Sequence, residues 1–144
     1  MRRSAPIARR RTAHTVGRGI LVSEVVMAAK DELGRRGEDL AADFLAAGGM
    51  QLVERNWRCS QGEIDLVVRD GDELVFVEVK TRSSLGFGHP LEAITVQKLA
   101  RLRRLAAAWC AAHPGPHGLV RIDAVAVVAP AFGAVAIEHL KRVF

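Results

Sequence analysis

The chain has 144 residues, a length typical of one domain. A hydrophobic fraction of 49% and a charged fraction of 26% exclude wholesale disorder and provide for a packed core. No apolar run approaches the roughly 20 residues of a membrane-spanning helix, and no apolar segment follows the basic start as a signal peptide requires. We therefore expect no membrane partner. Cys59 and Cys110 have no metal-binding spacing and are expected to be free thiols in a reducing cytoplasm.

The net charge of +5 is concentrated near the N-terminus. Residues 1–26 contain six arginines and one acid, so the rest of the chain is neutral. We expect residues 1–29 to form a basic, disordered tail and residues 30–144 to form the folded domain. Three interpretations of the tail stay open. It is a basic arm with non-specific affinity for phosphate, a targeting segment, or an extension that the natural protein lacks because its start is Met27.

Hydrophobic periodicity predicts two helices and five strands in the order α-β-β-β-α-β-β, which is an α/β arrangement. Gly48 and Gly49 end the first helix, and Thr95 caps the second. The predicted elements are a helix over 31–47, strands over 51–59, 63–69 and 73–81, a loop over 83–90, a helix over 96–112, and strands over 119–128 and 134–138.

Two of the predicted strands carry acids within apolar runs. Asp65 lies in Gly62–Val67, and Glu78 lies in Val77–Lys80. A carboxylate buried in such a run is costly unless something pairs with it. A hard divalent cation is one such partner, because it prefers oxygen ligands.

The register of the hairpin between these strands decides whether the acids meet. Asp-Gly is a strong turn signal, and a two-residue turn at Asp70 and Gly71 predicts that Arg69 pairs with Asp72. The same register pairs Glu63 with Glu78. It makes Asp65 and Glu78 diagonal neighbours on one face of the sheet, with Lys80 beside them.

This geometry predicts a magnesium site, with Mn²⁺ as a substitute. Asp65 and Glu78 are the expected metal ligands, and Glu38 of the first helix completes the shell through a water. Lys80 is expected to orient the attacking water or to offset charge on the phosphorane. The predicted catalytic residues are therefore Asp65, Glu78, Lys80 and Glu38. The alternative is a structural hairpin in which Glu63, Glu78 and Lys80 form ion pairs.

Four segments resemble the YraN family of small bacterial proteins: Gly34–Glu38, Gly62–Leu66, Val77–Arg82 and Arg121–Asp123. This family is related to archaeal Holliday-junction resolvases and to the restriction-endonuclease-like PD-(D/E)xK superfamily. The resemblance covers residues 33–144 and not the basic tail.

The resemblance implies a restriction-endonuclease-like core, in which a mixed β-sheet is flanked by helices. It also implies that Asp65, Glu78 and Lys80 occupy the active-site positions, with Glu38 as the acid on the helix. The chain departs from the motif at Ile64, where the superfamily's name has proline.

Several basic residues could bind the phosphates of a nucleic acid. Arg82 follows the predicted catalytic strand, and the second helix begins with Gln97, Lys98 and Arg101 on a basic side. The alternative is a solvated helix face. Phe87 could stack on a base or could cover the core.

The predicted function is a metal-dependent endonuclease that hydrolyses DNA phosphodiester bonds, with branched DNA as a candidate substrate. The alternative is a non-catalytic nucleic-acid-binding or scaffold module that keeps the nuclease fold. Two symmetric cuts would suggest a homodimer, although no surface in the sequence indicates its interface.

Overall fold

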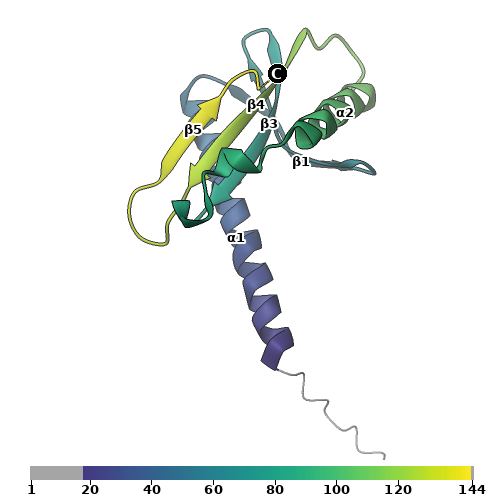
Figure 1. The fold of residues 1–144 in the computed structure, drawn as a ribbon. Helices are drawn as coiled ribbons and strands as arrows, with labels where there is room; N and C mark the ends of the chain where they lie inside the picture. Colours follow the sequence, from purple (N-terminus) through teal and green to yellow (C-terminus); the bar gives the residue numbers. More distant parts are fainter. Residues whose placement is uncertain (1–17, 144) are drawn as a thin grey trace, which may run out of the picture.

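The computed structural model describes residues 18–143 of the chain, which form a mixed five-stranded sheet with two α-helices (Figure 1). The predicted α/β class and the order α-β-β-β-α-β-β are therefore confirmed, and two short 3-10 helices are added after the third strand. The elements are α1 (Arg18–Ala47), β1 (Gln51–Cys59), β2 (Gly62–Asp70), β3 (Glu73–Arg82), η1 (Leu85–Phe87), η2 (Pro90–Ala93), α2 (Val96–Ala112), β4 (Leu119–Val128) and β5 (Ala136–Leu140).

The strands lie in the sheet in their chain order, β1-β2-β3-β4-β5. All neighbouring pairs are antiparallel except β3 and β4, which are parallel. Parallel neighbours need a long crossover connection, and the segment containing η1, η2 and α2 supplies it.

The sheet has an apolar cluster on each face. Ala41 and Leu45 of α1 pack with one cluster, and Leu105 and Trp109 of α2 pack with the other. Side chains of β3 alternate between the two clusters, so the central strands are buried on both faces. An acid in the central strands is consequently removed from water.

Helix α1 begins at Arg18, well before the predicted residue 31. Residues 22–32 are all exposed, so this part of the helix has no buried face. Hydrophobic periodicity did not predict this part of the helix, because periodicity detects a helix by its buried side and Val22 and Val25 are exposed. Residues 1–17 lie outside the described residues. The proposed tail and the alternative start at Met27 stay predictions.

The predicted register of the β2–β3 hairpin was wrong. Asp70 pairs with Glu73, so the two turn residues are Gly71 and Asp72 rather than Asp70 and Gly71. Gly71 has a φ of +58°, as glycine does at the first position of a type II′ turn. Tertiary ion pairs favour this register, because the buried Arg121 contacts the carboxylates of both Asp70 and Glu73.

The other boundaries agree closely with the sequence predictions, apart from the last strand. The hydroxyl of Thr95 caps α2 by accepting from the backbone N–H of Lys98 at 3.2 Å. Strand β5 begins at Ala136 instead of residue 134, because Gly133 has a φ of +105° and the connection from β4 continues beyond it. Between Arg18 and Val143, neither helix is both long enough and apolar enough to cross a bilayer.

Candidate functional site

Helix α1 crosses β3 at a very close contact. Gly37 is buried against Thr81, and there is no space at position 37 for a side chain. Glu38 follows directly and is half-buried. The missing side chain at Gly37 therefore allows the carboxylate of Glu38 to approach the strands.

Strand pairing is interrupted on both sides of Asp65. The β2–β3 ladder ends at the pair Leu66–Val77, and the β1–β2 register omits Asp65 and its opposite residue, Asn56. Asn56 has a φ of +50°, a left-handed conformation that asparagine tolerates. In place of the ladder, the backbone N–H of Val79 donates to Oδ2 of Asp65 at 2.8 Å. This bond fixes the orientation of the carboxylate.

Three carboxylates converge at this interruption. One oxygen from each of Glu38, Glu63 and Asp65 lies within 4.8 Å of the other two. Oxygens on opposite sides of one Mg²⁺ are roughly 4 Å apart, so a small adjustment would let the three share an ion. Arg58 also pairs with Glu63, at 2.9 Å. Sequence reasoning did not include Glu63 among the metal ligands. Glu63 lies two residues before Asp65 on the same predicted strand, and this spacing was the available signal that the two acids could lie close together.

Glu78 and Lys80 come from β3, the other strand of the hairpin. The hairpin ladder ends at Leu66–Val77, directly before Asp65 and Glu78, and its register differs by two residues from the one that had made these acids diagonal neighbours. Both are nearly buried, at 8% and 7% exposure. Nζ of Lys80 lies 3.1 Å from Oε1 of Glu78. The predicted pair of Glu63 and Glu78 does not form.

The acids of the site oppose one another's ionisation. Burial, and then the charge of Glu78, raise the pKa of Asp65 to about 8, although the Val79 N–H bond acts in the opposite direction. Burial, followed by the charge of Glu63, raises the pKa of Glu38. The cluster therefore favours a cation or a bound proton. An all-carboxylate donor set fits a hard ion such as Mg²⁺.

A cavity of about 640 Å³ opens beside these acids, between α1 and the end of β3. Glu38, Lys80 and Arg82 all line it, so the predicted phosphate ligand Arg82 lies at this cavity. The predicted contacts from α2 do not line it. The cavity is lined by Lys30, Leu33, Gly34, Glu38, Val79, Lys80, Thr81, Arg82 and Ser83.

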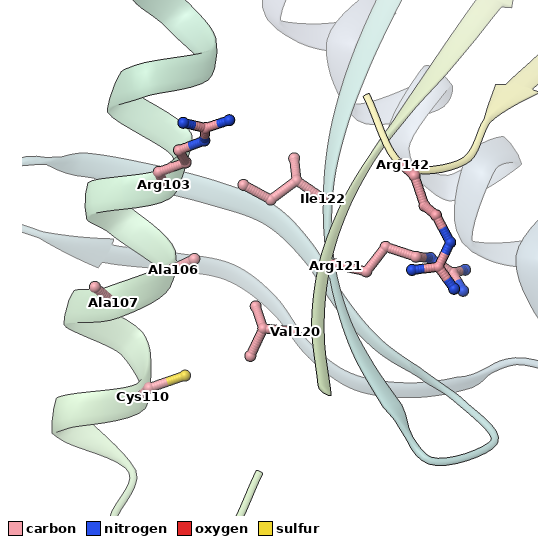
Figure 2. A pocket seen from close by; sticks show the side chains of 8 residues that line it. All are labelled: Arg103, Ala106, Ala107, Cys110, Val120, Arg121, Ile122 and Arg142. Atoms are coloured by element: carbon pink, nitrogen blue, oxygen red, sulfur yellow. The ribbon is translucent and has the colours of Figure 1, made fainter. Parts of the chain in front are cut away.

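A second cavity, of about 450 Å³, lies between α2 and β4, away from the acids (Figure 2). Val120 and Ile122 point toward α2, whereas Arg121 extends from the other side of the strand toward Arg142. The polar groups of this cavity therefore do not converge on a common point. Its lining indicates no chemistry.

A buried ionic network is centred on Asp123 of β4, which pairs with Val77, the residue before Glu78. Asp123 is fully buried, and Nε of Arg121 donates to its Oδ1 at 2.9 Å, as expected for an ordinary ion-pair partner. His139 adds a bond of 2.7 Å to Oδ2 of Asp123. Burial acts to lower the pKa of Arg121, but its hydrogen bonds to Asp123 and Asp70 outweigh this effect and raise the pKa. The carboxylate of Asp123 is therefore hydrogen-bonded to two side chains, Arg121 and His139.

His89, Cys59 and Cys110 lie outside the acid cluster. Nδ1 of His89 accepts from Leu91 N–H, and its Nε2 pairs with Glu138 at 2.9 Å, so both ring nitrogens are occupied. Cys59 and Cys110 are free thiols, as predicted. The side chain of Phe87 lies outside the described part of the structure.

Comparison with known proteins places the chain in a family. The model of uncharacterised protein family UPF0102 matches residues 37–127, more than half of the chain. The chain belongs to the UPF0102 family. This is the YraN family that the motifs indicated, so the resemblance is confirmed.

Relatives in the UPF0102 family match nearly their whole length. A UPF0102 protein of Beutenbergia cavernae is 61% identical over 117 residues, which cover 81% of this chain and 99% of that protein. One from Arthrobacter sp. (strain FB24) is 58% identical over 117 residues, with the same two coverages. One from Frankia casuarinae is 54% identical over 118 residues, covering 82% and 100%. These names state a family and no activity.

Proposed function

We propose that this protein is a metal-dependent endonuclease that hydrolyses phosphodiester bonds in DNA. The observation that carries the proposal is the buried Asp65, which is oriented by a backbone N–H and surrounded by Glu38, Glu63 and Glu78. Like charges held together in a dry site favour a cation. The mixed sheet and the order of its elements agree with the restriction-endonuclease-like core that the family resemblance implies.

The proposed roles follow from the positions of the side chains. Asp65 and Glu78 hold Mg²⁺ or Mn²⁺, and Glu38 and Glu63 complete its shell directly or through water. The bound ion would polarise the phosphoryl oxygen and lower the pKa of a coordinated water. Lys80, paired with Glu78, is close enough to orient the attacking water and to offset negative charge on the phosphate.

Two groups of basic residues are proposed to contact the DNA backbone. Arg82 lies at the cavity beside the acids. Helix α2 contains four basic residues and no acid, and its Gln97, Lys98 and Arg101 would contact phosphates farther from the cut. Branched DNA is the proposed substrate class on the strength of the family's relation to junction resolvases.

The test is a cleavage assay on linear, nicked, flapped and four-way DNA with Mg²⁺ or Mn²⁺. Asp65→Ala, Glu78→Ala and Lys80→Ala should each abolish cleavage and leave DNA binding largely intact. Glu38→Ala should reduce cleavage. Asp43→Ala is its matched control, because Asp43 is an exposed acid on the same helix.

Two results would contradict the proposal. Cleavage that survives Asp65→Ala would show that the site is elsewhere. DNA binding without cleavage of any substrate would favour the alternative, a non-catalytic binding or scaffold module. Sedimentation of the active species would test whether paired cuts require a homodimer.

A further inference from the structure

The most exposed large apolar side chain among those described is an aromatic ring. Phe132 is 94% exposed and lies in the connection between β4 and β5. Its neighbours in the chain, Ala131, Gly133 and Ala134, are small and exposed. Because no bulky neighbour shields the ring, both of its faces are open to a planar ligand.

The loop that carries Phe132 is held at both ends. Ala129 is buried at 1% exposure, and Val135 packs against the α1-side cluster. The positive φ of Gly133, +105°, turns the chain directly after the ring. Because both ends of the loop are packed against the domain, the ring of Phe132 is held in a defined position. A loop that only contacts solvent would not need such anchoring.

The base of this loop is bonded to both elements that carry the candidate site. The backbone N–H of Ala129 donates to the carbonyl of Arg82 at 2.8 Å, and Arg36 donates to the carbonyl of Pro130 at 3.0 Å. Arg82 lines the cavity beside the acids, and Arg36 is two positions from Glu38. The base of the loop at Ala129, three residues before the ring, therefore lies next to Arg82, which lines that cavity. In Figure 1 the β4–β5 loop extends on the same side of the sheet as η1 and η2.

We infer that Phe132 stacks on an unpaired base of DNA bound at the candidate site. This inference rests on the proposed nuclease function and narrows its substrate to DNA with unpaired bases beside the cut. A base inside a duplex is already stacked on both faces, whereas an unpaired base has a free face for an aromatic ring. The segment from Ala124 to Ile137 contains no charged residue. The loop can therefore offer an aromatic ring for stacking, but no charged group to contact a phosphate.

The experiment measures binding rather than cleavage. The full chain is titrated, with Ca²⁺ in place of Mg²⁺, into two DNAs: a flapped duplex with 2-aminopurine at the first unpaired position, and a fully paired duplex of the same sequence. Phe132→Ala should raise the Kd for the flapped DNA by about 5- to 100-fold, the range of one lost base–aromatic stack. It should leave the Kd for the duplex within about twofold. The wild type should quench 2-aminopurine fluorescence more strongly than the variant.

Phe132→Leu is the matched control for apolar contact, and Phe132→Trp is the control for an aromatic face. Stacking predicts that the leucine variant resembles Phe132→Ala and that the tryptophan variant resembles the wild type. Leu85→Ala, at a 60% exposed residue of the neighbouring loop, should change neither Kd.

Three results would overturn the inference. Equal Kd values for wild type and Phe132→Ala on flapped DNA would exclude a role for Phe132 in binding. The proposed nuclease site at Asp65 would not be affected by that result. Conversion of an oligomer to a monomer by Phe132→Ala, with unchanged DNA binding, would identify the loop as a protein contact. The absence of binding to either DNA by the wild type would reject both this inference and the proposed function.

Discussion

Gly37 of α1 lies against Thr81 of β3 so closely that a Cβ atom at position 37 would be 1.8 Å from Oγ1 of Thr81. The same Cβ would lie 2.7 Å from the Cβ of Thr81, so a change of rotamer at Thr81 could not relieve the contact. The distance between helix and strand at the candidate site thus depends on the absence of one methyl group.

Gly37→Ala should therefore displace α1 and reduce both stability and cleavage. Overpacking of this kind costs about 1–3 kcal/mol, and a displacement of about 1 Å at Glu38 can lower the rate roughly 100-fold. Urea unfolding and a cleavage assay measure the two effects. Gly34→Ala is the control, because nothing lies within 4 Å of a Cβ at that position. It should stabilise the helix by up to about 1 kcal/mol. Identical behaviour of the two variants would show that the contact does not position the site.

The pKa of Asp65 predicts how stability depends on pH in the absence of divalent ions. Asp65 keeps its proton up to about pH 8 when folded but loses it near 3.8 when unfolded. The folded state binds more protons in this interval, so the stability present below pH 4 decreases as the pH rises toward 8. The slope from one proton is at most about 1.4 kcal/mol per pH unit. Asp65→Asn should flatten this decrease in urea unfolding measured in EDTA. The prediction would be contradicted if the free energy of unfolding of the wild type rose from pH 5 to 8 and that of Asp65→Asn rose by the same amount.

Metal binding should release a proton from Asp65. Carboxylate ligands bind Mg²⁺ in the ionised form, and with a pKa of about 8 Asp65 is mostly protonated at pH 6.5. We expect up to about one proton released per ion at that pH and little at pH 9.5. Isothermal titration calorimetry in buffers of different ionisation enthalpy measures this number. Asp65→Asn should remove the dependence on buffer, and Asp43→Ala should preserve it. Equal proton release at both pH values would argue against Asp65 as the ligand.

Local patterns were sufficient to predict the five strands, α2, the C-terminal end of α1 and the principal acids, because these depend on neighbours in the chain. The strands of the central sheet alternate or are wholly apolar, and Thr95 caps its helix as its position suggested. Asp65, Glu78 and Lys80 were visible because charges in apolar strands are unusual.

The features that the sequence did not reveal depend on distant partners. The turn register follows contacts of Arg121 with Asp70 and Glu73, which are separated from it by a helix and two loops. Glu63 lies in the acid cluster beside the interruption at Asn56, and the sequence offered only its spacing of two residues from Asp65 as a signal. The exposure of Phe132 depends on where the ends of its loop are anchored. Sequence periodicity contains none of this information.

Arg121 offers a test of whether tertiary charge sets the hairpin register. Its side chain is 4% exposed and contacts Asp70, Glu73 and Asp123. Arg121→Met would leave a fully buried Asp123 with less positive charge beside it, and such a loss costs about 3–5 kcal/mol. Amide hydrogen exchange in β2 and β3 should become faster, since the pair that closes the hairpin loses its common partner.

Arg142→Met is the matched control for Arg121→Met. The side chain of Arg142 is 59% exposed and pairs with Glu73 from outside, so its loss should cost less than about 1 kcal/mol. Its backbone N–H still donates to Asp123 in the variant. Urea unfolding compares the two losses, and exchange at Val68 and Val75 reports the hairpin. Protection of these amides that is unchanged in Arg121→Met would mean that the Gly71–Asp72 turn specifies the register without help from β4. The positions of Asp65 and Glu78 at the end of the ladder would then follow from local turn geometry alone.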